Sequence, residues 1–250
     1  ETEDGWGLLE FKASQTEVLT VTELKAARVE MGDDKYLQEF ECSFTAAVEG
    51  SYYGQLLNDL DEKNHIQEFP RDDLCKTVCA WDLGMGDSTA IWVAQIAGSE
   101  IRMIDFYENN GVGLDNYVNW LRHNGWDKAE QILPHDVQVR ELGTGKSRLE
   151  VLTDAGLNIR VAPRMGVDDG IQAVRRLLPR CWFNVPKVKQ GLDALRNYRR
   201  DYDEKRKIFY ERPLHDWSSH ASDAFRYLAI GLNETTGWSK MPTNNVKWIV

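Results

Sequence analysis

Runs of β-branched and aromatic residues give the chain its clearest pattern from residue 75 onward. Three such runs, at 75–84, 88–98 and 99–108, are separated by turns that contain Gly and Asp. This spacing predicts an antiparallel meander. Strand-like and helix-like segments then alternate, with helices expected at 113–125 and 147–156 and strands at 129–136 and 157–163. A meander followed by such an alternation predicts an α/β fold, with a mixed central sheet that carries helices on its faces.

Two further segments have a distinct pattern nearer the C-terminus. Residues 196–202 and 207–212 alternate as strands around the turn "DEKR", which predicts an added β-hairpin. In 218–232, apolar residues recur at helical spacing from Ala221 to Leu232, so we expect a helix that packs on the sheet. Ser218 or Ser219 would cap it.

Residues 1–74 look different, with short helices and loops and no regular alternation of strands. A helix is expected at 20–32, because Thr20 or Thr22 precedes an acidic first turn and Gly32 follows its end. We interpret 1–74 as a linker or the tail of a preceding domain. Residues 75–235 would form the main domain, and 236–250 a C-terminal tail.

Composition narrows the class of protein. The chain has 250 residues, 42% of them hydrophobic, which is enough for one large core. No apolar run reaches the length of a membrane span, and the acidic N-terminus is unlike a signal peptide. The four cysteines form no CxxC pair and are expected to be reduced and mostly buried, as in a cytosolic protein.

The charge is unevenly distributed. The net charge is -10, yet 160–200 contains ten basic and only three acidic residues. Each charge taken singly is compatible with a solvated helix face. A basic region within an acidic chain nevertheless makes a polyanionic partner worth considering.

The segment "GTGKS" at 143–147 resembles part of a nucleotide-binding loop but lacks one of its requirements. A P-loop needs a first glycine five residues before the Gly-Lys-Ser, and Arg140 stands there. We therefore do not expect ATP binding at this segment.

Three aspartates stand where a ligand site would form. Asp82 and Asp136 end two predicted strands, and the carboxyl ends of strands are where ligands gather in α/β sheets. Asp223 lies near the start of the last predicted helix, three residues after His220 and on the same face. Singly, Asp82 could shape a turn, Asp136 could cap or hydrogen-bond, and Asp223 could favour the helix dipole.

Together the three acids favour a metal site. Clustered carboxylates repel one another unless cations lie between them, and Mg2+ and Mn2+ prefer such oxygen ligands. A pair of these ions can activate water on one side of a phosphodiester and stabilise the leaving oxygen on the other.

Four blocks of sequence, "AWDLGMGDSTAIWV", "ILPHD", "GTGKSRLEVLTDAGLNIRVAPR" and "HDWSSHASDAFRYLA", resemble the nuclease domain of the large terminase subunit of tailed bacteriophages. They occur in the family's order within about 75–235. The segment 20–57 is similar to the family's connection between the packaging ATPase and the nuclease. The resemblance implies an RNase H-like fold and an isolated nuclease fragment, whose ATPase domain is missing from this chain.

The resemblance also implies an activity. The chain would be an endonuclease that cuts double-stranded viral DNA with little sequence specificity during genome packaging. Two Mg2+ or Mn2+ ions would be held by Asp82, Asp136 and Asp223, with His220 as a further catalytic residue that ligates metal or orients water. Lys146 and Arg148 would lie near the active-site edge and contact DNA, although Lys146 could equally be a solvated lysine. Ser147 would cap the following helix.

Partners and location follow from the same resemblance. We expect double-stranded DNA, the terminase small subunit and the portal as partners, no membrane, and the host cytoplasm as the location. The hairpin adds a second DNA contact, because basic residues gather near its tip: Arg199, Arg200, Lys205, Arg206 and Lys207. A charged tip also keeps an exposed hairpin soluble.

Two alternatives remain open. An RNase H-like transposase or junction resolvase would carry similarly arranged acids, although many transposases have Glu at the third position. A non-catalytic DNA-binding module would use the acids only structurally. The sequence leaves the roles of Asp87, Asp105 and Asp216 undecided.

Overall fold

The computed structural model describes residues 11–16, 18–31, 36, 39–41, 50–84, 87–140, 145–203 and 205–235. The chain divides into two compact units. The sheet unit consists of His65–Gly191 and His220–Val250, and the hairpin unit of Glu1–Asn64 and Leu192–Ser219. The boundaries expected at 75 and 235 rest on the change in sequence pattern and stay predictions.

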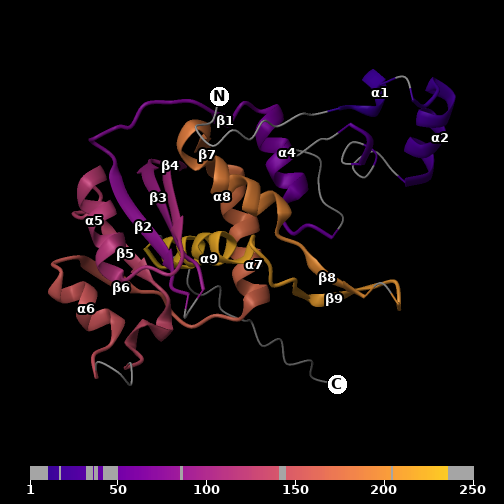
Figure 1. The fold of residues 1–250 in the computed structure, drawn as a ribbon. Helices are drawn as coiled ribbons and strands as arrows, with labels where there is room; N and C mark the ends of the chain where they lie inside the picture. The colour runs from indigo at the N-terminus through magenta and orange to yellow at the C-terminus, as the bar shows by residue number, and fades with distance from the viewer. Residues whose placement is uncertain are drawn as a thin grey trace, which may run out of the picture. The chain divides into compact units, whose positions relative to one another are not determined.

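The sheet unit is built on a seven-stranded mixed sheet in the order β1-β7-β4-β3-β2-β5-β6 (Figure 1). The three central strands β2, β3 and β4 are antiparallel neighbours, which confirms the predicted meander. The outer strands pair in parallel. The strands are β1 Ile66–Gln67, β2 Lys76–Asp82, β3 Thr89–Ala97, β4 Glu100–Asn109, β5 Glu130–Leu133, β6 Asn158–Val161 and β7 Cys181–Asn184.

Helices cover both faces of this sheet, as the sequence predicted (Figure 1). One face carries α5 Leu114–Asn124 and α6 Arg148–Asp154. The other carries α7 Val167–Leu177, α9 Ser219–Thr235 and the first part of α8 Val185–Asn197. Two short 3-10 helices, η1 His135–Gln138 and η2 Leu178–Arg180, lie between these elements. The expected mixed sheet with helices on its two faces is confirmed.

Aromatic side chains fill the core on each face of the sheet. On the α5 side, Trp81 lies 6.1 Å from Tyr117, measured between ring centroids. On the α9 side, Trp92 packs against Phe106 and Phe225 at 4.7 and 5.3 Å. The indole N–H of Trp92 also donates to the Ala221 carbonyl at 2.8 Å, which fixes the first turn of α9 over the sheet.

The hairpin unit contains α1 Ala13–Thr16, α2 Val21–Met31, α4 Gly54–Glu62 and the hairpin β8 Arg200–Asp203 with β9 Ile208–Pro213. Thr20 and Glu23 exchange hydrogen bonds at the start of α2, so Thr20 is its cap. The added hairpin is confirmed. Its first strand was expected from residue 196, which is wrong because α8 continues to Asn197.

Other expectations concern cysteines and membrane spans. The described cysteines Cys75, Cys79 and Cys181 are free, and the last two are buried. Cys42, the fourth, lies outside the described residues. Among the described helices, none has the length and apolar content that crossing a membrane requires.

The buried side chain of Gln131 links β2 to the segment that leads into β5. Gln131 has no exposed surface, accepts a hydrogen bond from the Trp81 indole at 2.9 Å and donates to the carbonyls of Trp126 and Ala129. Buried polar groups are stable only when they are paired in this way. The side chain therefore fixes the geometry of β2 and β5, the strands that lead to Asp82 and Asp136.

We expect Gln131→Leu to lower the free energy of unfolding by about 1–3 kcal/mol, because it leaves the buried Trp81 indole N–H without an acceptor. A urea titration at constant m-value measures this loss. Adding Trp81→Phe removes the donor, so the double variant should be more stable than the sum of the two single losses predicts. Strict additivity would contradict the pairing.

Candidate functional site

Three neighbouring strands set the first part of the site. Asp82 on β2 pairs in register with Ala90 on β3, which in turn pairs with Glu108 on β4. Directly opposite residues on antiparallel strands point to the same face of a sheet. Two residues farther along β3, Trp92 packs on α9, so Asp82 and Glu108 both face α9.

His220, in the first turn of α9, bridges two carboxylates. Its Nδ1 lies 3.1 Å from Oδ2 of Asp82 and its Nε2 lies 3.1 Å from Oδ1 of Asp87. The hydrogen bond with Asp82 and the charges of both aspartates raise the pKa of His220 to about 9, against the opposing effect of burial. With a proton on each ring nitrogen, the imidazolium donates to both acids. His220 thus links Asp82 to Asp87.

Asp87 reaches His220 because the chain turns sharply after Asp82. A Cβ on Gly84 would lie 2.3 Å from the Ser88 carbonyl oxygen, so only glycine fits this close approach of backbone. The guanidinium of Arg148 donates to the carbonyl of Leu83 at 3.1 Å. The Arg148 hydrogen bond thus holds the backbone just after Asp82, where Gly84 allows the close approach to Ser88.

Glu108 adds a further carboxyl to this group. Burial raises the pKa of Glu108, and the charges of Asp82 and Asp87 add to that rise. The positive charge of His220 opposes it, which shows that Glu108 lies within electrostatic reach of the imidazole. Sequence reasoning missed Glu108 as a site residue. Its pairing with Ala90, opposite Asp82, depends on strand register, which the sequence pattern does not specify.

Asp136 follows the strand next to β2, and Asp223 lies one turn after His220 on α9. β5 runs parallel to β2, with Ile132 opposite Ala80, and Asp136 is exposed in η1 just after β5. Burial raises the pKa of the Tyr227 hydroxyl to about 12, and the charges of Asp82, Asp136 and Asp223 add to that rise. The charges of the three predicted acids thus all act on one half-buried phenol.

Asp223 has a cationic partner of its own. Its Oδ1 lies 3.0 Å from Nη2 of Arg226, one turn farther along α9. The guanidinium side chain is only 10% exposed. Asp82 and Asp223 are thus each matched with a protein cation, His220 for the first and Arg226 for the second.

Lys146 and Arg148, the predicted DNA contacts of this unit, differ in their surroundings. Lys146 forms an exposed ion pair with Asp154 at 2.9 Å. Arg148 is half-buried and holds the Leu83 carbonyl, as described above. Between them, Ser147 caps α6 in a capping box with Glu150, which confirms the capping role expected for the "GKS" serine.

The basic residues of the hairpin unit are also not equivalent. Arg199 is paired with Asp216 at 3.3 Å, and the guanidinium of Arg200 lies over the Tyr52 ring at 5.9 Å. Both stand at the base of the hairpin, where Arg200 pairs with Pro213, so their expected place near the tip is wrong. Arg200 is exposed, and so are the three residues at the hairpin turn: Lys205, Arg206 and Lys207. Asp203 accepts hydrogen bonds from the backbone N–H groups of Lys205 and Arg206 and so fixes this turn.

Asp105 and Asp216 have structural partners. Asp105 is buried, accepts a hydrogen bond from the Trp126 indole at 2.9 Å, and has its pKa raised by burial. Asp216 accepts from the backbone N–H and the hydroxyl of Ser218 ahead of α9. Asp105 lies on the α5 face, because its register partner Val93 belongs to the core there. It therefore does not join the acids that face α9.

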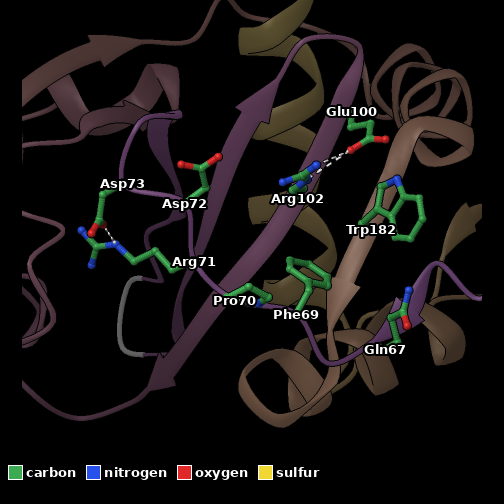
Figure 2. Close-up of a pocket in the computed structure, with 9 residues that line it drawn as sticks. All are labelled: Gln67, Phe69, Pro70, Arg71, Asp72, Asp73, Glu100, Arg102 and Trp182. Carbon is green, nitrogen blue, oxygen red and sulfur yellow. Dashed lines mark hydrogen bonds and ion pairs between the residues drawn. The ribbon is translucent and has the colours of Figure 1, made fainter.

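A hollow of about 470 Å³ lies elsewhere on the sheet unit (Figure 2). Its lining includes Glu100 and Arg102 at the start of β4, whereas Glu108 stands near the end of that strand. The charges pair within the lining, Arg102 with Glu100 at 2.8 Å and Arg71 with Asp73 at 2.6 Å. None of the predicted site residues lines this hollow.

Solved structures resemble this chain, while no protein-family model and no curated protein matches it. A large terminase from a thermophilic bacteriophage matches 91% of the chain with a TM-score of 0.56 and 16% identity. The chain spans only 55% of that protein's length.

Two isolated nuclease domains also match. The P22 large terminase nuclease domain covers 69% of this chain and 89% of its own length, with a TM-score of 0.52 and 18% identity. The match to the large terminase nuclease from thermophilic phage G20c with bound magnesium includes 73% of this chain and 97% of that nuclease. Its TM-score is 0.51 and the identity is 16%. The chain therefore shares the RNase H-like fold of large terminase nuclease domains.

Proposed function

We propose that the chain is a metal-dependent endonuclease that cleaves double-stranded DNA with little sequence specificity, as part of a phage large terminase. The observation that carries this proposal is the contact of His220 in α9 with Asp82 at the end of β2, on a terminase nuclease fold. Asp223 lies one turn after His220, and Asp136 follows β5, the parallel neighbour of β2. A role in starting and ending the packaging of viral DNA would follow. The small terminase subunit and the portal would be its partners.

The residues fit a divalent cation. Carboxylate oxygens are the ligands that Mg2+ and Mn2+ prefer, and Asp82, Asp136 and Asp223 would hold two such ions. Protein cations already offset part of this negative charge, as His220 does for Asp82. When bound, the ions would activate water for in-line attack and stabilise the leaving oxygen, giving 3'-hydroxyl and 5'-phosphate ends.

His220 would act through its proton. Both of its ring nitrogens face carboxylates, so the ring is held as an imidazolium. A cation at Asp82 would favour loss of that proton, and a neutral imidazole can ligate metal or accept a proton near pH 7. Asp87, fixed by the turn after Asp82, would keep Nε2 oriented in either state.

Plasmid digestion separates this proposal from the alternatives. Supercoiled, linear and branched DNA are incubated with Mn2+, Mg2+ or a chelator. Cutting of any duplex only with metal supports the terminase nuclease, and cutting of branched DNA alone supports a junction resolvase. Binding without cutting supports a non-catalytic module.

We expect Asp82→Asn or Asp136→Asn to lower the cleavage rate at least ~100-fold, about 2.7 kcal/mol of transition-state stabilisation, because the amide keeps the size but loses the charge that holds the cation. The rate of plasmid linearisation in Mn2+ measures this. Asp127→Asn, which removes a half-buried carboxylate paired with Lys128, is the matched control and should cut normally. Normal rates in Asp82→Asn would remove Asp82 from the site.

Lys146 and Arg148 should separate by kinetics. Lys146→Ala should reduce the slope of log DNA affinity against log salt concentration by about 0.9, the contribution of one phosphate contact. Asp154→Asn should tighten DNA binding, because it releases Lys146 from its ion pair. Arg148→Ala should mainly lower kcat, because it frees the Leu83 carbonyl beside Asp82. Binding measured across a series of salt concentrations and single-turnover rates distinguish them. ATP binding that Lys146→Ala abolishes would contradict the role in DNA binding.

The three basic residues of the hairpin turn test whether the hairpin tip contacts DNA. Lys205→Ser, Arg206→Ser and Lys207→Asn are combined, with asparagine at 207 because its φ of 55° lies in the left-handed region. Arg199 is left intact because it pairs with Asp216. Each lost phosphate contact should reduce the salt slope by about 0.9, with the largest loss of affinity at low salt. Wild-type cleavage across the salt series would show that DNA does not touch the hairpin tip.

A further inference from the structure

We propose that Arg226 is a positioning residue, which holds Asp223 in the orientation that a divalent cation needs, and that Gly170 on α7 provides the space for its side chain. This inference rests on the proposed role of Asp223 as a metal ligand. It adds to that role a residue that does not itself touch metal or DNA.

The first observation is the contact itself. Nη2 of Arg226 lies 3.0 Å from Oδ1 of Asp223, and the two residues stand one turn apart on α9. Exposed ion pairs of this kind contribute little, because both side chains stay mobile in water. This guanidinium side chain is 10% exposed and Asp223 is 30% exposed, so burial limits how far the donor can move. Burial therefore fixes the position of the Arg226 guanidinium in this ion pair.

The second observation is the path of the arginine chain. A Cβ placed on Gly170 would lie 2.3 Å from Cδ and 2.6 Å from Cγ of Arg226. Gly170 lies inside α7, where glycine is a poorer helix former than alanine, and its φ lies outside the left-handed region. The backbone conformation thus does not require glycine here, but the passage of the Arg226 side chain does.

The contact with Arg226 bears on the rotamer of Asp223. A carboxylate that ligates metal is commonly held by a hydrogen bond to a neighbouring group, which fixes its rotamer. Arg226 holds Oδ1 from a planar, permanently charged donor. Its positive charge also repels a metal cation. If Arg226 acted mainly by repulsion, its removal would strengthen cation binding, whereas loss of positioning would weaken it. Without positioning, Asp223 would sample other rotamers and cation binding would weaken.

Mn2+ binding to the full chain tests this directly, by calorimetry or by the electron paramagnetic resonance signal of free Mn2+. Arg226→Gln should weaken Mn2+ binding by about 10–100-fold. Arg226→Lys, which keeps the charge but loses the fork, should recover part of that loss. Adding Arg226→Gln to Asp223→Asn should change nothing further, because the arginine acts through the aspartate. Unchanged or tighter binding in Arg226→Gln would overturn the proposal.

Gly170→Ala provides a second route that leaves both charged residues in place. Its methyl group should displace the Arg226 chain and weaken Mn2+ binding in the same direction. Should Arg226→Gln fail to fold by circular dichroism, Gly170→Ala decides the question, and unchanged Mn2+ binding in a folded Gly170→Ala would count against the proposal. Arg160→Gln is the matched control, because Arg160 also makes a half-buried ion pair, with Glu130, and donates to α9 at Gly231. It should bind Mn2+ as the unaltered protein does.

The outcomes separate this inference from the proposed function. If Asp223→Asn binds Mn2+ normally, Asp223 is not a ligand and both claims fail at that residue. If Asp223→Asn weakens binding but Arg226→Gln does not, only the positioning role of Arg226 is lost.

Discussion

Repulsion between carboxylates is the constraint on which this site depends. The register of β2, β3 and β4 puts Asp82 and Glu108 on one face of the sheet, and the turn after Asp82 adds Asp87 to them. Like charges this close oppose folding unless cations lie between them. The protein meets the constraint with His220, whose imidazolium touches Asp82 and Asp87 at once.

The balance of charge at the site depends on the position of α9. Its first two turns carry His220, Asp223 and Arg226, so a shift of the helix would move both protein cations relative to the acids of the sheet. The Trp92 indole bond to the Ala221 carbonyl and the packing of Phe225 on the sheet prevent such a shift. Hydrophobic burial thus sets the positions of the charges.

The sequence predicted the elements that have a strong local pattern. The meander β2–β4, the helix α9 and the Ser147 cap all follow from periodicity or capping chemistry within a few residues. The four-residue strand β7 and the start of the hairpin were missed or misplaced. β7 is too short to show a period, and α8 extends to Asn197, so it takes the first two residues of the predicted strand.

The site divides in the same way. Asp82, Asp136 and Asp223 were predicted from strand ends and a helical stripe, and they stand at the end of β2, just after β5 and in α9. Glu108 and Asp87 could not be predicted, because strand register and a turn bring them to His220. Arg226 was hidden for another reason: only the missing side chain of Gly170, far away in sequence, shows where its guanidinium can go. Residues at strand ends and on helical stripes can thus stand out in the pattern, whereas the residues that contact them become visible only once the chain is folded.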